Sequence, residues 1–347
     1  MKQLTRTPVA LAALASLLFN YSAFSAASAP NRPAPQPEPV FSGGAICDSI
    51  LQGQKALEDF PFLKIANFNI ENLFIAGHMS PNAPADASGR RENKPVKALI
   101  GVANVILRQL PHIVVLEEVD RDGTSLQFFV EHYLRGIYDF KIAPSPDGRG
   151  IANAFLVRKD LPVETAIISH GTEQWQDPTQ GNRTEPLFQR DLPLLAIYPK
   201  GEVDLEKAPL LGIFGVHFKS KRERAGDPQS RILRRAEATR AAEIFRRYLA
   251  KWGENTPLMI SGDFNGVVGT EDEFTEFRQN IPADNVRAAL LAGEEGSLLR
   301  GTHMYLPRGG KFEVNELDYQ VLNRAITKYA IGLVTDRYKV SRADLTY

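Results

Sequence analysis

Cysteine is almost missing from this sequence, because Cys47 is the only one among 347 residues. A single cysteine forms no intramolecular disulfide, so the fold has to be held together by its core. The six histidines, at positions 78, 112, 132, 170, 217 and 303, lack the spacing of zinc ligands. The sequence also lacks a Gly-rich phosphate loop, a Gly-x-Ser-x-Gly nucleophile motif and a dinucleotide fingerprint. These absences argue against zinc-dependent, P-loop, serine-hydrolase and dinucleotide-binding functions.

Long hydrophobic runs are also missing, apart from one short stretch near the N-terminus. Lys2 and Arg6 precede the apolar residues 9–18, and small residues follow up to Ala29. This order is typical of a secretory signal peptide, and the apolar stretch is too short to span a bilayer. We therefore expect residues 1–29 to be a signal peptide, and the protein to be exported to the periplasm or the extracellular space without an integral membrane segment. A buried N-terminal helix is the alternative, but the segment shows no amphipathic pattern.

Proline is concentrated just after this segment. Five prolines lie between positions 30 and 39, so residues 30–45 are expected to form an extended linker. No internal repeat and no second linker follow. Residues 46–347 are therefore expected to form one domain, whose oligomeric state the sequence does not indicate.

Charge of one sign does not dominate the chain, which has 41 basic and 41 acidic residues. A neutral protein of this kind does not bind nucleic acid through net charge alone. The local distribution differs, because residues 217–251 contain eleven Lys or Arg and four acidic residues. Most of these cations are expected on the solvated face of a helix, but the basic segment begins beside a candidate catalytic residue, where a phosphate substrate would be favoured.

Apolar periodicity predicts alternating strands and helices. Strands are expected over 63–70, 113–116, 151–157, 163–168, 192–198, 210–218, 257–260 and 317–322, and helices over 95–110, 125–134 and 230–251. Pairs of adjacent strands separate the helices. This order predicts an α/β fold with mixed sheets rather than a doubly wound parallel sheet.

Polar side chains follow five of the predicted strands. They are Asn67, Asn69 and Glu71; Glu117 and Glu118; His217 and Lys219; Asp263 and Asn265; and Asp318. Alone, each group is more typical of surface polarity, and Gly262-Asp263-Phe264-Asn265 is equally typical of a turn. Together they predict a pocket, and several carboxylates in one pocket require a cation. Carboxylates and amides suit Mg²⁺ or Mn²⁺.

In their order, these segments resemble the endonuclease/exonuclease/phosphatase superfamily, which includes DNase I-like and exonuclease III-like enzymes. The matching segments span roughly residues 63–322 and are Asn67-Phe68-Asn69-Ile70-Glu71-Asn72-Leu73, Leu116-Glu117-Glu118-Val119, Val216-His217-Phe218-Lys219-Ser220-Lys221, Gly262-Asp263-Phe264-Asn265 and Leu317-Asp318-Tyr319. The resemblance implies a four-layer α/β sandwich, in which two mixed β-sheets face each other and helices lie outside.

The resemblance also implies a role for each matching residue. Glu118 is similar to the metal-binding glutamate, Asn69 lies in the same metal site, and Glu71 is a further acidic metal contact. Asp263 resembles the residue that orients or deprotonates the attacking water. His217 and Asn265 are similar to residues that contact the phosphate. The resemblance further implies that Lys219 and Arg190 bind the substrate, and that Asp318 holds a C-terminal histidine.

The resemblance therefore implies an exported, divalent-metal-dependent phosphodiesterase, with a nuclease acting on DNA or RNA as the first expectation. A sphingomyelinase or an inositide phosphatase of the same superfamily is the second. The superfamily's Ser-Asp-His motif is not found in this sequence, which has no histidine after His303. A catalytically inactive phosphate-binding homologue is therefore the third reading.

Overall fold

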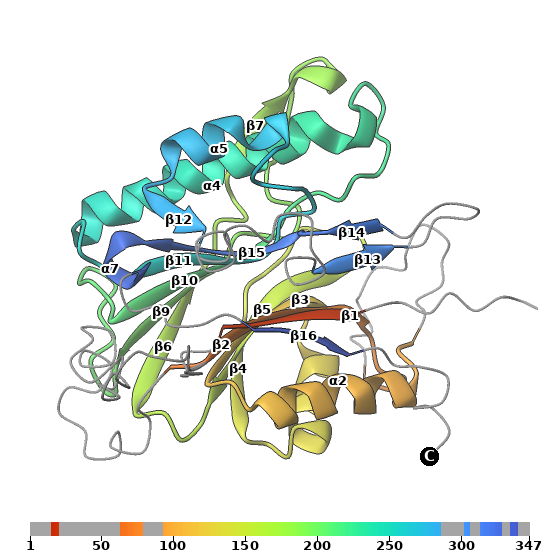
Figure 1. Cartoon of the computed structure of the whole chain (residues 1–347), viewed down its shortest axis with the longest axis vertical. Helices are drawn as coiled ribbons and strands as arrows, with labels where there is room; N and C mark the ends of the chain where they lie inside the picture. Colours follow the sequence, from red (N-terminus) through yellow and green to blue (C-terminus); the bar gives the residue numbers. More distant parts are fainter. Residues whose placement is uncertain are drawn as a thin grey trace, which may run out of the picture.

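Two six-stranded sheets face each other in the computed structural model, and helices cover the outer face of each (Figure 1). The structure describes residues 15–20, 63–78, 93–285, 302–305, 313–327 and 334–338. The order of the layers is helix, sheet, sheet, helix. The four-layer α/β sandwich expected from the sequence is confirmed. The predicted linker and the C-terminal segment after residue 338 lie outside the described residues.

The first sheet has the strand order β16-β1-β2-β3-β5-β4. Its strands are β1 (Ala15–Asn20), β2 (Ile65–Leu73), β3 (Ile113–Asp120), β4 (Tyr138–Ile142), β5 (Ile151–Arg158) and β16 (Val334–Tyr338). Only β2 and β3 pair in parallel, so the sheet is mixed.

Strand β1 lies within the expected signal peptide. Its backbone pairs antiparallel with β2 and with β16. Cleavage after residue 29 would remove this strand from the sheet. The signal peptide and the export that it implies stay predictions.

The second sheet has the strand order β12-β15-β11-β10-β9-β6. Its strands are β6 (Val163–Ile168), β9 (Leu194–Pro199), β10 (Leu211–His217), β11 (Leu258–Asp263), β12 (Ala283–Asn285) and β15 (Asp318–Asn323). Here β10 and β11 are the parallel pair. Each sheet thus has one parallel pair, whose carboxyl ends lie at one edge.

Helices and hairpins complete the described part of the chain. The helices are α2 (Val96–Gln109), α3 (Thr124–Phe128) with the π-helical turn Phe129–Tyr133, α4 (Arg231–Trp252), α5 (Thr275–Asn280), α7 (Arg324–Thr327) and the 3-10 turns Pro178–Gln180, Pro228–Ser230 and Asp272–Phe274. The hairpins are β7 (Gln174–Asp177) with β8 (Arg183–Pro186), and β13 (His303–Tyr305) with β14 (Glu313–Asn315). Within the described ranges, no helix has the length and apolarity needed to cross a membrane.

The strands separate three apolar cores, because alternate side chains point to opposite faces. In β3, Ile113 and Val115 enter the space between the sheets, whereas Val114 and Leu116 face the outer helices. On the other sheet, Phe214 and Ile260 pack against α4 and α5. This alternation decides which polar side chains also enter the inter-sheet space.

Gly215 allows the two sheets to approach closely. A Cβ atom there would lie 3.0 Å from the Phe155 ring and 3.3 Å from a methyl group of Val115, and both side chains belong to the opposite sheet. The close approach brings the polar strand ends of the two sheets within hydrogen-bond distance.

Candidate active site

The inter-sheet space is apolar at one end and polar at the other. On β10 the same face carries Ile213, Gly215 and then His217, and on β11 it carries Met259, Ser261 and then Asp263. The other strands continue in the same way into further buried polar residues, namely Asn67 of β2, Glu117 of β3, Asn153 of β5, and Asp318 and Gln320 of β15. The period of two therefore collects polar side chains from both sheets in one place.

Sheet register places three predicted residues next to each other. His217 pairs with Asp263 in the parallel ladder of β10 and β11. Asp263 pairs with Asp318 in the antiparallel ladder of β11 and β15. Two amides of β2 reach them across the inter-sheet space: Asn69 Nδ2 donates to Asp263 Oδ2 at 3.2 Å, and Asn67 Nδ2 donates to Asp318 Oδ1 at 3.4 Å.

His217 lies between two carboxylates of this cluster. Its Nε2 atom is 3.8 Å from Asp263 Oδ2 and 3.8 Å from Glu118 Oε1. Asn69, Glu118, His217, Asp263 and Asp318, all predicted site residues, are thus brought together. We call them, with Asn265, the catalytic cluster, after the roles that the sequence predicts for them.

The segment that follows β11 holds Asp263 and Asn265 in a fixed arrangement. The Asn265 backbone N–H donates to Asp263 Oδ1 at 2.7 Å, and its side-chain Nδ2 donates to the Phe218 carbonyl at 3.0 Å. Gly262 has a φ of +142°, and a Cβ atom there would lie 2.1 Å from the Val216 carbonyl oxygen. Only glycine fits at this close approach of β11 to β10.

Glu118 enters the cluster because β3 contains a bulge. The register with β5 shifts between Leu116 and Val119, and Glu118 has a φ of 62°. A bulge re-aims the side chains next to it. Glu117 and Glu118, which are adjacent in sequence, therefore both reach the inter-sheet side, although a regular strand would send them to opposite faces.

Glu71, the third predicted metal ligand, lies at the rim. The residue is exposed, and its backbone N–H donates to Asn69 Oδ1 at 3.0 Å. The distorted end of β2 gives Glu71 a φ of 51°. No hydrogen bond joins its carboxylate to Glu118 or Asp263 among the residues described.

Lys219 and Arg190, the predicted substrate-binding residues, lie beside the catalytic cluster. Arg190 is 3% exposed, donates to the Phe218 carbonyl at 2.9 Å, and has its Nε atom 3.3 Å from Asp147 Oδ2. Lys219 Nζ donates to Gln189 Oε1 at 3.0 Å. The Phe218 carbonyl thus accepts from both Arg190 and Asn265, which links Arg190 to the cluster.

Burial and clustering shift the ionisation of the cluster. Burial raises the pKa of Asp263 to about 6, and Glu118 adds to the rise, whereas hydrogen bonds from Asn265 and Asn69 oppose it. Burial, followed by the positive charges of Arg190, Arg149 and Lys219, holds the pKa of His217 well below its usual value. His217 is therefore a neutral imidazole at neutral pH, and Asp263 titrates close to neutrality.

Glu117 is the buried carboxylate that sequence reasoning left without a role. Its side chain is fully buried, and neither carboxylate oxygen has a hydrogen-bond partner among the described residues. Burial raises the pKa of Glu117 well above its usual value, and Asp318, Asp263 and Glu118 raise it further. Glu117 lies two residues beyond the apolar Val115, so the strand period of two could have indicated that its carboxylate enters the same inter-sheet space.

The donor set fits a hard divalent cation. The cluster contains three carboxyl groups and the Asn69 amide, and the neighbouring Glu117 adds two oxygens without a hydrogen-bond partner among the described residues. Mg²⁺ and Mn²⁺ prefer such oxygen donors. In the described part of the chain, no three His, Cys, Asp or Glu side chains form a ready-made metal-binding group. The cation and its ligands therefore stay predictions.

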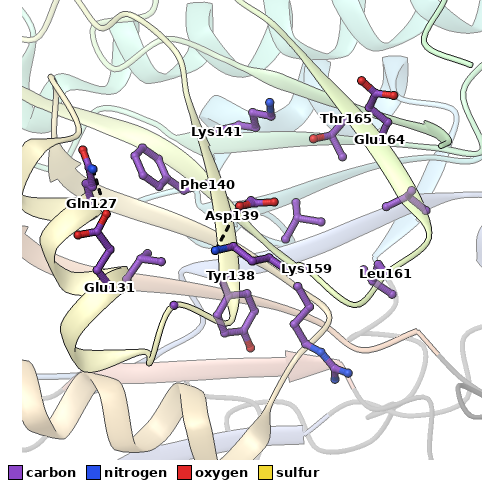
Figure 2. A pocket seen from close by; sticks show the side chains of 15 residues that line it. Gln127, Glu131, Tyr138, Asp139, Phe140, Lys141, Lys159, Leu161, Glu164 and Thr165 are labelled. Atoms are coloured by element: carbon purple, nitrogen blue, oxygen red, sulfur yellow. Dashed lines mark hydrogen bonds and ion pairs between the residues drawn. The ribbon is translucent and has the colours of Figure 1, made fainter. Parts of the chain in front are cut away.

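Two cavities differ sharply in charge. The first, which we call the basic cleft, has a volume of about 540 Å³ beside the cluster, and its charged lining residues are Arg149, Arg190, Lys219, Arg222, Asp147 and Glu185. The second, of about 410 Å³, lies at the opposite end of β5, between β4, β6 and the turn after α3 (Figure 2). Its three cations balance its three carboxylates, and Lys159 pairs with Asp139 at 3.7 Å. Of these two cavities, only the basic cleft has the excess of positive charge that favours an anion.

Solved structures provide neighbours with low sequence identity. The chain is similar to truncated TDP2 from Caenorhabditis elegans, with 16% identity over 69% of this chain and 81% of that chain and a TM-score of 0.45. It is also similar to the human Nocturnin catalytic domain with bound sulfate, with 14% identity over 79% and 94% of the two chains and a TM-score of 0.46.

An endonuclease/exonuclease/phosphatase from Bacteroides vulgatus is a further neighbour, with 14% identity over 79% of this chain and 98% of that chain and a TM-score of 0.45. Its description names the superfamily that the sequence motifs resemble. No family model and no curated protein sequence matches this chain. Identities and TM-scores this low say nothing about substrate.

Proposed function

We propose that this protein hydrolyses phosphodiester bonds of nucleic acid with the help of a divalent cation, Mg²⁺ or Mn²⁺. The observation that carries the proposal is the catalytic cluster itself. A neutral imidazole lies 3.8 Å from each of two carboxylates where the two sheets meet. Phosphoryl transfer to water needs a base, a donor to the phosphate and a counter-charge, and the cluster supplies candidates for all three.

Glu118 and Asn69 would hold the cation, and Glu71 would contribute from the rim. When bound, the cation supplies positive charge that polarises a phosphate oxygen and stabilises the charge that develops there. The unpartnered oxygens of Glu117 support a need for positive charge at the same end of the core.

Asp263 would accept the proton of the attacking water. Its pKa of about 6 keeps most of it ionised at neutral pH and still basic enough to take a proton. The Asn265 N–H and the Asn69 amide fix the orientation of its two oxygens. Asp263 thus presents its carboxylate in one defined position.

His217 and Asn265 would contact the phosphate, and Lys219 and Arg190 would balance its charge. A neutral imidazole carries one N–H that can donate to a phosphate oxygen. Asp318 accepts a hydrogen bond from Asn67 and thereby holds β15 against β2. Its predicted partner, a C-terminal histidine, would lie outside the described residues.

The basic cleft favours nucleic acid over a phosphocholine lipid. Four cations line it, and none of its lining residues is aromatic. A quaternary ammonium group is recognised by aromatic rings and is repelled by Lys and Arg. Nucleic acid instead gains affinity from each cation that neutralises a phosphate.

A substrate panel tests the proposal. Purified protein is incubated with plasmid DNA, total RNA, sphingomyelin vesicles and an inositol polyphosphate, with Mg²⁺, with Mn²⁺ and with EDTA. We expect cleavage of DNA or RNA with either metal and none with EDTA. Release of phosphocholine or of inorganic phosphate, with both nucleic acids intact, would transfer the assignment to a lipid or inositide substrate. Absence of any turnover, with Mg²⁺ bound normally in a calorimetric titration, would support an inactive binding protein.

A further inference from the structure

The basic cleft contains more positive charge than its own carboxylates neutralise. Asp147 is shared between two arginines, because its Oδ1 lies 3.4 Å from Arg149 Nε and its Oδ2 lies 3.3 Å from Arg190 Nε. Glu185 accepts a hydrogen bond at 2.8 Å from Arg224, which is not a lining residue of the cleft. Both carboxylates of the cleft are thus occupied by arginines.

Two cations remain without a carboxylate partner. Lys219 Nζ donates to the neutral amide oxygen of Gln189 at 3.0 Å. The exposed Arg222 lines the cleft and has no acidic partner among the residues that the structure describes. Burial lowers the pKa of Lys219, and Arg190 lowers it further. Cations that repel one another in this way are stabilised by a bound anion.

The cleft is continuous with the catalytic cluster. Arg149 Nη1 lies 3.9 Å from Glu118 Oε1, the same oxygen that lies 3.8 Å from His217 Nε2. Arg190 and Asn265 donate to one carbonyl, that of Phe218. A phosphate bound in the catalytic cluster would therefore have the cleft directly beside it.

Fixed contacts hold the walls of the cleft in place. The Lys219 backbone N–H donates to Glu237 Oε2 at 2.6 Å, and the Lys219 carbonyl accepts from Arg234 Nη1 at 3.0 Å. Both partners belong to α4, and both are buried. The helix thus fixes the backbone of Lys219, two residues beyond the end of β10, on both sides. The Lys219 ammonium group is therefore attached to a rigid backbone position.

We propose that the basic cleft is a second anion subsite, which takes a phosphate adjacent to the one in the catalytic cluster. This inference rests on the proposed function and narrows it to a substrate with at least two neighbouring phosphates. A nucleic-acid strand meets this condition at every internal linkage, whereas a dinucleotide or a lipid with a single phosphodiester does not. Arg222 and Lys219 provide the charges still available to that second phosphate.

Binding of small nucleotides tests the subsite separately from catalysis. Thymidine 5′-monophosphate and thymidine 3′,5′-bisphosphate are titrated calorimetrically, with Mg²⁺, into protein carrying Asp263→Asn. Chromatography after each titration verifies that the nucleotides are intact. The same titrations are repeated after adding Arg222→Gln and, as a matched control, Arg246→Gln, which changes an exposed arginine on α4 outside the cleft.

We expect the bisphosphate to bind roughly tenfold more tightly than the monophosphate, because charge-assisted hydrogen bonds to the second phosphate contribute. Arg222→Gln should reduce this preference to about threefold, and Arg246→Gln should leave it unchanged. Equal dissociation constants for the two nucleotides would overturn the proposal of a second anion subsite. Equal effects of Arg222→Gln and Arg246→Gln on the preference for the bisphosphate would overturn it as well. Tighter binding of inositol 1,4-bisphosphate than of the thymidine bisphosphate would overturn the nucleic-acid strand as its occupant. If the proposed function is wrong but the subsite exists, DNA and RNA will stay intact in the substrate panel, while the protein will still bind the bisphosphate more tightly than the monophosphate.

Discussion

Glu117→Gln should stabilise the metal-free protein at alkaline pH. The buried Glu117 carboxylate has no hydrogen-bond partner among the described residues and faces the charges of Asp318, Asp263 and Glu118. Its pKa is raised in the folded state, so the folded protein retains a proton that the unfolded chain releases above about pH 4.5. The stability of the folded state therefore falls as pH rises above that value.

The size of the effect follows from proton linkage, because each pH unit over which the folded protein holds a proton that the unfolded chain has released costs about 1.4 kcal/mol of stability. Glutamine removes this titration while it keeps the shape of the side chain. Near pH 4.5 wild type and variant should be equally stable, because Glu117 is then neutral in the folded protein. At pH 8 the variant should be more stable by about 1–3 kcal/mol, which corresponds to a few degrees in Tm for a domain of this size.

The assay is thermal and urea unfolding in EDTA at pH 4.5 and pH 8, for wild type, Glu117→Gln and the control Glu254→Gln, which changes an exposed glutamate. The control should follow wild type at both pH values. If Glu117→Gln lowers stability at pH 8, or if the difference does not grow between the two pH values, then the carboxylate is well accommodated and the reasoning is wrong.

Three further substitutions test the rest of the structure. Burial lowers the pKa of His112 to about 4, so stability should be full above about pH 6.5 and fall by up to about 3 kcal/mol as pH drops toward 4. His112→Asn should remove that slope in urea unfolding, and a slope equal to wild type would contradict the assignment. Gly262→Ala should cost about 3 kcal/mol or more, because its Cβ would overlap the Val216 carbonyl; a Tm within a degree of wild type would contradict the close approach of β10 and β11. Phe155→Ala should cost about 3–5 kcal/mol in the inter-sheet core, and a loss below about 1 kcal/mol would mean that this core is loosely packed.

The regular parts of the site were predictable from sequence. Asp263 and His217 end strands whose preceding residues alternate between the two cores, so the period of two states on which face each lies. Their pairing partners follow once β10 and β11 are taken as parallel neighbours. The motif order added the expectation that both sheets contribute to one pocket.

The positions of the other site residues could not be predicted, because they depend on irregular backbone. Glu118 reaches the inter-sheet side only through a bulge, and a strand pattern alone would place either Glu117 or Glu118 there, but not both. Asp147 and Arg149 lie in the segment between β4 and β5, which has no periodic pattern to indicate a direction. Their importance comes from contacts with Arg190 and Glu118, which are distant from them in sequence.

Some elements were also missed or misjudged. Hairpin β7–β8 is polar apart from Trp175 and Pro186, so it lacks the apolar alternation that predicts strands. In α2, Leu99, Val102, Ala103 and Ile106 form the buried stripe, whereas the apolar residues Val96 and Ile100 of the same helix are 61% and 46% exposed. Helix periodicity allows more than one stripe, and the position of the sheet beneath selects between them.

Asp263→Asn tests the central claim most directly, because Asp263 contacts the cluster from both sheets and the substitution preserves its shape. Cleavage of DNA or RNA with Mg²⁺ is measured for wild type, for this variant and for Asp139→Asn, which changes an exposed aspartate in the second cavity. We predict a loss of at least about a hundredfold in kcat for Asp263→Asn, with the fold and Mg²⁺ binding retained, and wild-type rates for Asp139→Asn. A wild-type rate in Asp263→Asn would contradict the assignment of the inter-sheet cluster as the active site.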